Sequence, residues 1–146
     1  MSYYRHILVG LDLSPESQFV IERVKEMSQD RDLKISLLYV QEPLSFAYGG
    51  DIPMDLSEVQ VQMEEQAAKR LHSFCQQLDI PTENSHVLIG QPAHEMHDFA
   101  KNKDIDLIVV GSHGRHGLAL MFGSTANGVL HGATCDVLAV RIPEQV

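Results

Sequence analysis

Glycines, two serines and several basic side chains gather in one segment of the 146-residue sequence, GSHGRHGLALMFGS from Gly111 to Ser124. Its four glycines lack a Cβ, so backbone N–H groups there can turn toward an anion. Ser124 would add a hydroxyl and the positive end of a helix dipole, and Arg115 or His116 would add positive charge. This chemistry suits a phosphate group, but the same glycines could equally do no more than shape a turn while Ser124 caps its helix.

A hydrolase would use some of the same residues. It would pair Ser112 or Ser124 with His113 or His116, but the sequence has no G-x-S-x-G elbow and no acid placed to orient an imidazole. We therefore expect no catalytic residues.

The eight histidines raise the question of a metal site. The best pairs are His94 with His97, one helical turn apart, and His113 with His116. A metal site needs three or four converging ligands, and no cysteine or acidic residue stands at ligand spacing to complete one. We expect solvated histidines and no bound metal at these positions.

Five short apolar runs alternate with longer helical patterns, the order that predicts parallel strands joined by crossover helices. Each run is rich in Val, Ile and Leu on both faces, as a strand buried between two helix layers requires. The sequence therefore predicts an α/β fold, a single doubly wound domain over residues 1–146 with helices on both faces of a parallel sheet. The predicted strands are Ile7 to Leu11, Ile35 to Val40, Val87 to Ile89, Leu107 to Val110 and Val137 to Val140.

Helix signals fill the stretches between these runs. Residues 14–16 offer a serine N-cap, a proline at the first helical position and an acid in the first turn. Residues 90–92 open another helix, and a last one runs from near Ser124 to Gly132. The clearest amphipathic helix carries an apolar stripe that we expect to be core, made of Leu56, Val59, Met63, Ala67, Leu71, Phe74 and Leu78.

Three features of interest follow the ends of predicted strands, namely Asp12, the stretch from Val40 to Glu42, and the glycine-rich segment. In an open parallel sheet, a ligand binds beyond the carboxyl ends of the strands, where the strand order reverses. Asp12 would either bind a ribose hydroxyl or start the turn before Ser14. The irregular stretch from Gln41 to Met54 is long for a connection, and such loops carry function or partner contacts.

Composition argues against several partners. The 11 Lys and Arg against 20 Asp and Glu give a formal charge of -9, and no basic cluster offsets it, so we expect no nucleic-acid or membrane binding. Cys75 and Cys135 belong to no CxxC pair, which favours free buried thiols in a reducing compartment. The N-terminal apolar run stops at Asp12, too short for a signal peptide or a membrane span, so we expect a cytoplasmic protein.

Three blocks of the sequence resemble the signature regions of the universal stress protein family: LVGLDLSPES, IDLIVVGSHGR and GSTANGVLHGATCDVLAVR. The likeness covers essentially the whole chain, and the last two blocks are the more diagnostic. It implies a Rossmann-like fold of the adenine nucleotide alpha hydrolase type, with a five-stranded sheet in the order 3-2-1-4-5. It also implies a homodimer formed through the last strand, residues 135–142.

The resemblance further implies residue roles, because the ATP-binding branch of the family carries Gly, two residues, Gly, nine residues, Gly and then Ser or Thr. By that mapping Asp12 and Val40 face the adenosine of ATP, and the phosphates face Gly111, Gly114, Gly123, Ser124 and Thr125. This sequence departs from the motif, since only eight residues separate the second glycine from the third. The spacing is similar to that of the other branch, whose best-known members do not bind ATP and lack most of these glycines.

Three functions stay open at this point. The first is a homodimeric stress-response protein that binds ATP or another adenine nucleotide, with Mg²⁺ as a possible companion. It would hydrolyse the nucleotide slowly if at all, because no residue qualifies as a general base. The second is a dimeric interaction protein of the same family that binds no nucleotide. The third is an ATPase proper, in which Asp12 would hold the metal ion.

Overall fold

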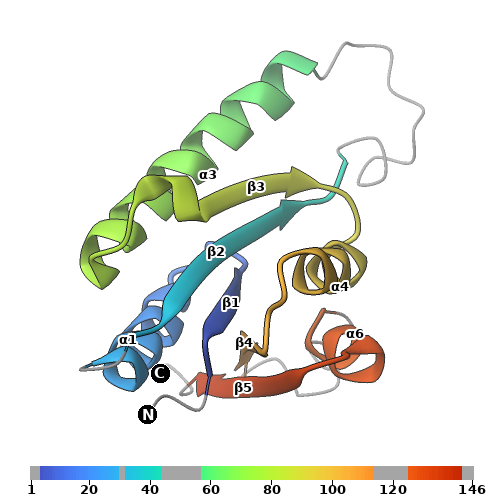
Figure 1. Ribbon diagram of the computed structural model, residues 1–146. Coiled ribbons are helices and arrows are strands. Elements are labelled where there is room, and N and C mark those ends of the chain that lie inside the picture. Colours follow the sequence, from blue (N-terminus) through green and yellow to red (C-terminus); the bar gives the residue numbers. More distant parts are fainter. Residues whose placement is uncertain (1–3, 30–31, 44–56, 114–124, 143–146) are drawn as a thin grey trace.

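The computed structural model describes residues 4–29, 32–43, 57–113 and 125–142 (Figure 1). Its centre is a five-stranded sheet, all of it parallel, in the order β3-β2-β1-β4-β5. The strands are His6–Leu11 (β1), Lys34–Gln41 (β2), Ser85–Ile89 (β3), Leu107–His113 (β4) and Asp136–Ile142 (β5). The predicted fold class and strand order are confirmed.

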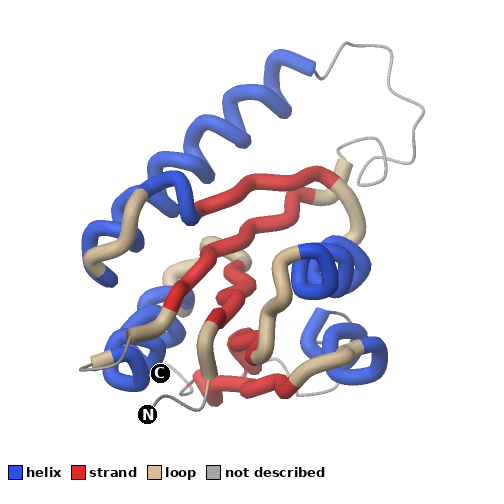
Figure 2. Tube along the Cα trace, in the orientation of Figure 1, coloured by secondary structure: helices blue, strands red, loops and turns tan. Residues whose placement is uncertain are grey.

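Helices cover both faces of this sheet (Figure 2). Helices α1 (Ser17–Ser28) and α3 (Ser57–Leu78) pack on one face, and α4 (Pro92–Asn102) and α6 (Thr125–Gly132) pack on the other. A short 3-10 helix, Thr82–Asn84, leads into β3. Within the described ranges, no helix combines the length and the apolar character needed to cross a membrane.

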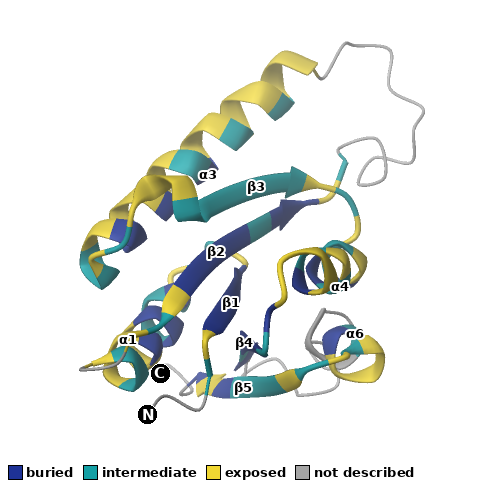
Figure 3. Cartoon of the chain, in the orientation of Figure 1, coloured by how far each residue is buried: buried dark blue, intermediate teal, exposed yellow. Residues whose placement is uncertain are grey.

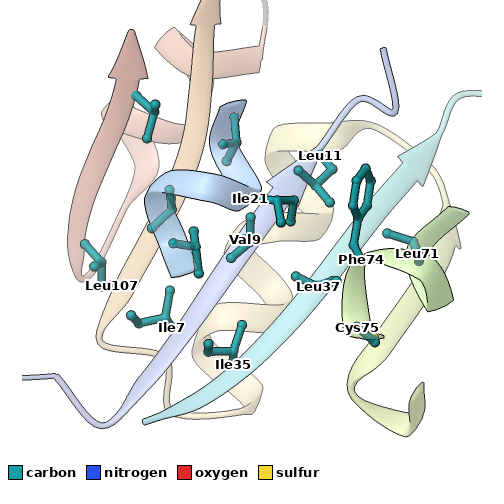
Figure 4. Packing of buried hydrophobic residues seen from close by; sticks show 14 of the residues in the cluster. Ile7, Val9, Leu11, Ile21, Ile35, Leu37, Leu71, Phe74, Cys75 and Leu107 are labelled. Carbon is teal, nitrogen blue, oxygen red and sulfur yellow. The ribbon is translucent and has the colours of Figure 1, made fainter. Parts of the chain in front are cut away.

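The larger core lies between the sheet and helices α1 and α3 (Figure 4). Alternate residues of β1, which are Ile7, Val9 and Leu11, point to this face, as the two-residue period of a strand requires. They share the core with Ile21 of α1 and Leu71 of α3, both fully buried. Burying one such side chain stabilises the fold by about 1.5 to 3 kcal/mol. These contacts fix the carboxyl end of β1 in place.

A second core lies on the opposite face, against α4 and α6. Leu8 of β1 and Leu38 of β2 pack there with Met96 of α4 and Val129 of α6. Strand β1 is therefore buried on both faces along its whole length, as Figure 3 shows. This double burial explains why its sequence is an unbroken apolar run rather than an alternating one.

Helix α1 begins at Ser17, later than the predicted N-cap at Ser14. Residues 14–16 instead form a turn, in which the N–H of Ser17 donates to the carbonyl of Ser14 at 3.0 Å. The Ser14 hydroxyl donates to Oδ1 of Asp12 at 2.7 Å. The Ser14 side chain is thus held toward the preceding strand, so the predicted cap is wrong and the helix starts only after the turn.

Helix α3 packs on the sheet over only part of its length. Leu71 and Phe74, in its second half, are buried. Val59 and Met63, predicted to be core, are instead 44% and 38% exposed, and Figure 3 shows the first half of the helix mostly exposed. The prediction was wrong for these two residues, because periodicity shows which face of a helix is apolar but not how far the sheet extends beneath it. Leu56 lies outside the described residues.

Both cysteines are free thiols, as predicted. Cys75 lies on the buried face of α3, and burial raises the pKa of its thiol. A buried thiol of raised pKa is a packing residue with little reactivity. Cys135, just before β5, is only partly buried, so the expectation of two buried thiols holds for Cys75 alone.

Candidate functional site

A cavity of about 330 Å³ opens at the carboxyl ends of the central strands β1, β2 and β4. The strand order reverses between β1 and β4, which is where open parallel sheets bind their ligands. The volume lies at the lower end of the range of about 300 to 1,000 Å³ that small-molecule sites occupy. The cavity is the first candidate for a functional site on both position and size.

Three of the predicted site residues meet in this cavity. Asp12 follows β1, Val40 lies near the end of β2, and Gly111 lies in β4, and all three line the same space. The structure therefore brings together the two residues assigned to adenosine and the first of those assigned to phosphate. Their roles toward a ligand stay predictions.

The glycine-rich segment begins inside a strand rather than after one. Gly111 pairs with Val140, and His113 pairs with Ile142, in the parallel register of β4 and β5. Strand β4 therefore continues past Val110, where the sequence predicts its end, because β5 runs alongside and supplies backbone partners. The first glycine of the motif is thus held rigidly by the sheet.

The rest of the predicted phosphate site is less fully described. Gly114, Gly123 and Ser124 lie outside the described residues. Thr125 is the first residue of α6. Of the predicted phosphate residues, the structure therefore places only Gly111, in β4, and Thr125, at the start of α6.

Two glycines keep the cavity open. A Cβ at Gly111 would lie 3.1 Å from Cγ2 of Val20 and 3.3 Å from Cδ1 of Ile142, and both neighbours are wall residues. A Cβ at Gly10 would lie 2.6 Å from Cε and 2.8 Å from Sδ of Met96. Gly10 and Met96 were missed as site residues, since a methionine at helical spacing looks the same whether it is plain core or a cavity wall.

Asp12 organises the turn that follows β1. Its Oδ1 accepts hydrogen bonds from the Ser14 N–H at 3.0 Å, the Ser14 hydroxyl at 2.7 Å and the Ser17 hydroxyl at 3.1 Å. Leu13 has a φ of 59°, in the left-handed region, and its carbonyl accepts from Nη1 of Arg70. This conformation costs a leucine about 1 to 2 kcal/mol, so the surrounding hydrogen bonds hold it. Of the two interpretations of Asp12, the turn is observed and the ribose contact stays a prediction.

The rim of the cavity is acidic. Asp12, Glu16 and Glu42 line it, and we call these three residues the acidic rim. Burial raises the pKa of the Tyr39 phenol above its ordinary value of 10.0, and the carboxylates of Asp12 and Glu42 raise it further. The phenol is therefore a protonated hydrogen-bond donor at neutral pH. Among the described lining residues there is no lysine, arginine or histidine.

The lining combines apolar walls with hydrogen-bonding groups, a combination that suits a nucleoside. Val40, Met96 and Val110 give the cavity apolar walls for a base, while carboxylates and a phenol can bind sugar hydroxyls. The described part of the lining carries no positive charge to offer a phosphate. A phosphate would have to be held by the glycine-rich segment, outside the described ranges, or by a metal ion.

The structure describes some of the residues considered for a metal or hydrolase site, whereas His116 and Ser124 lie outside the described residues. Nε2 of His94 lies 3.2 Å from Oδ2 of Asp98 on the next turn of α4. Nε2 of His97 lies 2.9 Å from the carbonyl oxygen of Val129 in α6, so the two histidines have separate partners. Within the part of the chain that the structure describes, no three His, Cys, Asp or Glu side chains are grouped to hold a metal ion. Ser112, considered as a nucleophile, is buried in β4.

Residues 3–141 match the sequence profile described as the Universal stress protein family. Universal stress protein A homolog 1 of Coxiella burnetii is 43% identical to this chain over 144 residues, covering 97% of this chain and 99% of the relative. Universal stress protein A homolog 2 of the same organism is 44% identical over 146 residues, covering 97% of this chain and 98% of the relative.

Solved structures share the fold over nearly the whole chain. Universal stress protein UspA from Lactobacillus plantarum superposes with a TM-score of 0.75 at 25% identity, covering 97% of this chain and 100% of its own. A universal stress protein in complex with cAMP gives 0.69 at 19% identity, covering 97% and 100%. A universal stress protein family protein from Arabidopsis thaliana with AMP bound gives 0.65 at 17% identity, covering 95% and 92%.

Proposed function

The chain belongs to the universal stress protein family, and we propose that it is a stress-response protein that binds an adenine nucleotide in the cavity at the carboxyl ends of β1, β2 and β4. The observation that carries the proposal is the meeting of Asp12, Val40 and Gly111 in one cavity of suitable size. The complexes of two structural neighbours with cAMP and AMP support the same ligand class.

In this proposal the nucleotide lies across the cavity. The base contacts Val40, Met96 and Val110, and the ribose lies toward Asp12 and Tyr39. The 5′ phosphates lie on the side of β4 and α6, against the predicted residues Gly111, Gly114, Gly123, Ser124 and Thr125. When the ligand is ATP, Mg²⁺ would supply positive charge to those phosphates.

We propose a binding role without significant catalysis. Activation of water for attack on a γ-phosphate needs a positioned base. Asp12 is the acid nearest that role, and its Oδ1 is already occupied by three donors from Ser14 and Ser17. Hydrolysis of a bound ATP would therefore be slow if it occurs at all.

The assembly in this proposal is a cytoplasmic homodimer, formed through residues 135–142 of a single domain spanning residues 1–146. Strand β5 lies at an edge of the described sheet, with β4 as its neighbour on one side. An edge strand presents backbone N–H and C=O groups that pair readily with another strand. A second copy of β5 would satisfy those groups.

A dimeric interaction protein that binds no nucleotide is the second candidate. The observation in its favour is the exposed apolar face at the start of α3, where Val59 and Met63 lie beyond the core. In that case the cavity would be a feature of the fold without a ligand, and the surface of α3 would carry the function.

One experiment separates the two candidates. Freshly purified chain is denatured, the released small molecules are identified by mass spectrometry, and the nucleotide-free protein is titrated with ATP, AMP and cAMP by calorimetry. Nucleotide released at near one per chain, or a micromolar Kd corresponding to about -8 kcal/mol, supports the proposal. A folded chain that releases no nucleotide and binds none of the three refutes it.

A variant tests the predicted phosphate side. Gly123→Val should abolish binding without unfolding the chain, because a β-branched side chain would prevent the backbone from approaching a phosphate. Circular dichroism serves as the fold control. Unchanged affinity in a folded Gly123→Val variant would refute the phosphate assignment.

A further inference from the structure

We infer that the acidic rim makes the cavity selective for adenine nucleotides whose ribose 2′ and 3′ hydroxyls are free, with Glu42 as the specificity-determining residue. Nucleotides that carry a phosphoryl group on either hydroxyl bind more weakly, in proportion to the negative charge that the group adds. This inference rests on the proposed function, since it names which adenine nucleotides the same cavity accepts.

The position of the rim in the fold supports this inference. Asp12 and Glu16 follow β1, and Glu42 follows β2, while the register of the two strands pairs Leu11 with Tyr39. The ends of β1 and β2 thus lie side by side, on the side of the cavity away from β5. Of the predicted phosphate residues, Gly111 lies in β4 and Thr125 opens α6. The three carboxylates therefore border the nucleoside end of the ligand.

The electrostatics of Tyr39 show how the rim acts. The Asp12 and Glu42 carboxylates both raise the pKa of the Tyr39 phenol, so their negative fields overlap at one lining residue. A phosphoryl group bound beside this phenol would meet the same two negative charges. No described lining residue carries positive charge to offset them. The cavity therefore opposes an anion at this point whatever the rest of the ligand is.

A free hydroxyl has the opposite interaction with the rim. An O–H group donates to a carboxylate in a charge-assisted hydrogen bond, while a phosphoryl dianion has no proton to donate and is repelled. Dinucleotide-binding domains follow the same rule, because an acid near the ribose accepts the 2′ hydroxyl and an arginine accommodates a 2′ phosphate. This cavity presents acids and, among its described residues, no arginine.

Of the three residues of the acidic rim, Glu42 is the one best placed to discriminate between free and phosphorylated ribose hydroxyls. Oδ1 of Asp12 is committed to the turn through Ser14 and Ser17. Glu16 belongs to the same turn and forms the N-cap position of α1. Glu42 lies just past the end of β2, and its side chain is exposed. Its carboxylate is therefore free to change rotamer and contact a ligand at the mouth of the cavity.

The test compares three ligands on the nucleotide-free full chain by calorimetry. They are 5′-AMP, cAMP, whose 3′ oxygen carries part of a singly charged phosphodiester, and adenosine 3′,5′-bisphosphate. At about 0.1 M salt we expect 5′-AMP to bind at least about tenfold tighter than the bisphosphate, with cAMP between them. Glu42→Gln should narrow the ratio of 5′-AMP to bisphosphate affinity at least about threefold, because it removes one charge of the rim.

Glu26→Gln is the matched control. Glu26 is exposed on α1, outside the cavity, and loses the same charge. It should leave the ratio unchanged, and about 1 M salt should narrow the ratio in the unmodified chain. Equal affinities for 5′-AMP and the bisphosphate overturn the inference, and so does an equal effect of Glu42→Gln and Glu26→Gln on the ratio of these affinities. In either case, measurable binding of 5′-AMP preserves the proposed function. A folded chain that binds none of the three ligands overturns both.

Discussion

The two ends of the sheet use polar side chains in opposite ways. At the amino end, Nδ1 of His6 donates to the carbonyl of Lys103 at 3.2 Å, and Nε2 of its neutral ring accepts from the hydroxyl of Ser36 at 2.8 Å. Asp106 accepts from the N–H groups of Arg5 at 2.9 Å and His6 at 3.0 Å. The polar groups at this end bind one another across three segments of the chain.

At the carboxyl end, the corresponding polar groups border a cavity. Asp12, Tyr39 and Glu42 line a space of about 330 Å³. Together with the proposed nucleotide site, this difference predicts that the amino end contributes to stability and the carboxyl end to binding, a division that parallel sheets favour. Substitutions at the amino end should therefore change the free energy of unfolding without changing affinity, and substitutions at the carboxyl end should do the reverse.

The largest effect is expected at the amino end, for Asp106→Ala. The substitution removes two hydrogen bonds to a carboxylate, each worth about 1.5 to 3 kcal/mol. Because the carboxylate is partly exposed, we expect a loss of about 3 kcal/mol in the free energy of unfolding, measured by urea denaturation. Nucleotide affinity of the folded variant should not change. A variant of normal stability with weakened affinity would contradict the division between the two ends.

Gly10→Ala should have the next largest effect, at the carboxyl end. The new Cβ would push Sδ and Cε of Met96 into the cavity, and we expect affinity to fall about tenfold, or about 1.4 kcal/mol. Stability should fall by about 1 kcal/mol, the lower end of overpacking costs. Calorimetry and urea denaturation measure the two changes.

Met96→Val provides the control for that prediction, since it removes the atoms that the new Cβ would meet. In the Met96→Val background, Gly10→Ala should weaken binding much less, a coupling that a double-mutant cycle measures. Equal losses of affinity in both backgrounds would show that Gly10→Ala weakens binding without displacing the Met96 side chain.

Ser17→Ala should give a smaller change in the turn that carries the acidic rim. The buried Ser17 hydroxyl donates to Oδ1 of Asp12 at 3.1 Å, and its removal should cost about 1 kcal/mol of stability. Two donors from Ser14 remain on Asp12, so affinity should fall less than about threefold. A larger loss of affinity than of stability would mean that Ser17 touches the ligand itself.

The smallest effect is expected from pH. Burial lowers the pKa of His6 and His86 below 6.5, and nearby lysines lower both further. As pH falls below about 6.5, the unfolded chain therefore takes up protons before the folded chain does, and stability is lost. Each histidine contributes a slope of at most about 1.4 kcal/mol per pH unit. Urea denaturation between pH 5 and 7.5 should show a shallower slope in His6→Asn, and an unchanged slope would exclude His6 as a source.

The order and type of the elements could be predicted from the sequence because each is a local pattern. The unbroken apolar run of β1 indicated a strand buried on both faces, and it is one. The strand order came from the family resemblance, since alternation alone does not order strands. The errors in predicted burial arose where contacts with residues distant in the sequence determine whether a side chain is covered. Val59 and Met63 carry the right periodicity, but nothing in their sequence shows that the sheet does not reach them.

The site could be predicted only in part, for a similar reason. Asp12, Val40 and Gly111 were found because strand ends and glycines are visible in a sequence, and the fold places all three in one cavity. Tyr39 adjoins the stretch from Val40 to Glu42 that the sequence singled out, so position was an available signal for it. Met96 had no such signal, since only the folded chain brings its side chain against Gly10.

The central place of β1 also affects how the chain folds. Strand β1 pairs with β4 through Ile7 and Leu107, which are 107 − 7 = 100 positions apart in the sequence. At roughly 5 to 20 residues per second, a ribosome needs roughly 5 to 20 s to synthesise that interval. During this time one edge of β1, a strand that is buried along its whole length in the folded chain, lacks its partner. A nascent chain of this protein therefore depends on helix α1 and strand β2, which emerge first, to shield β1 from aggregation until β4 arrives.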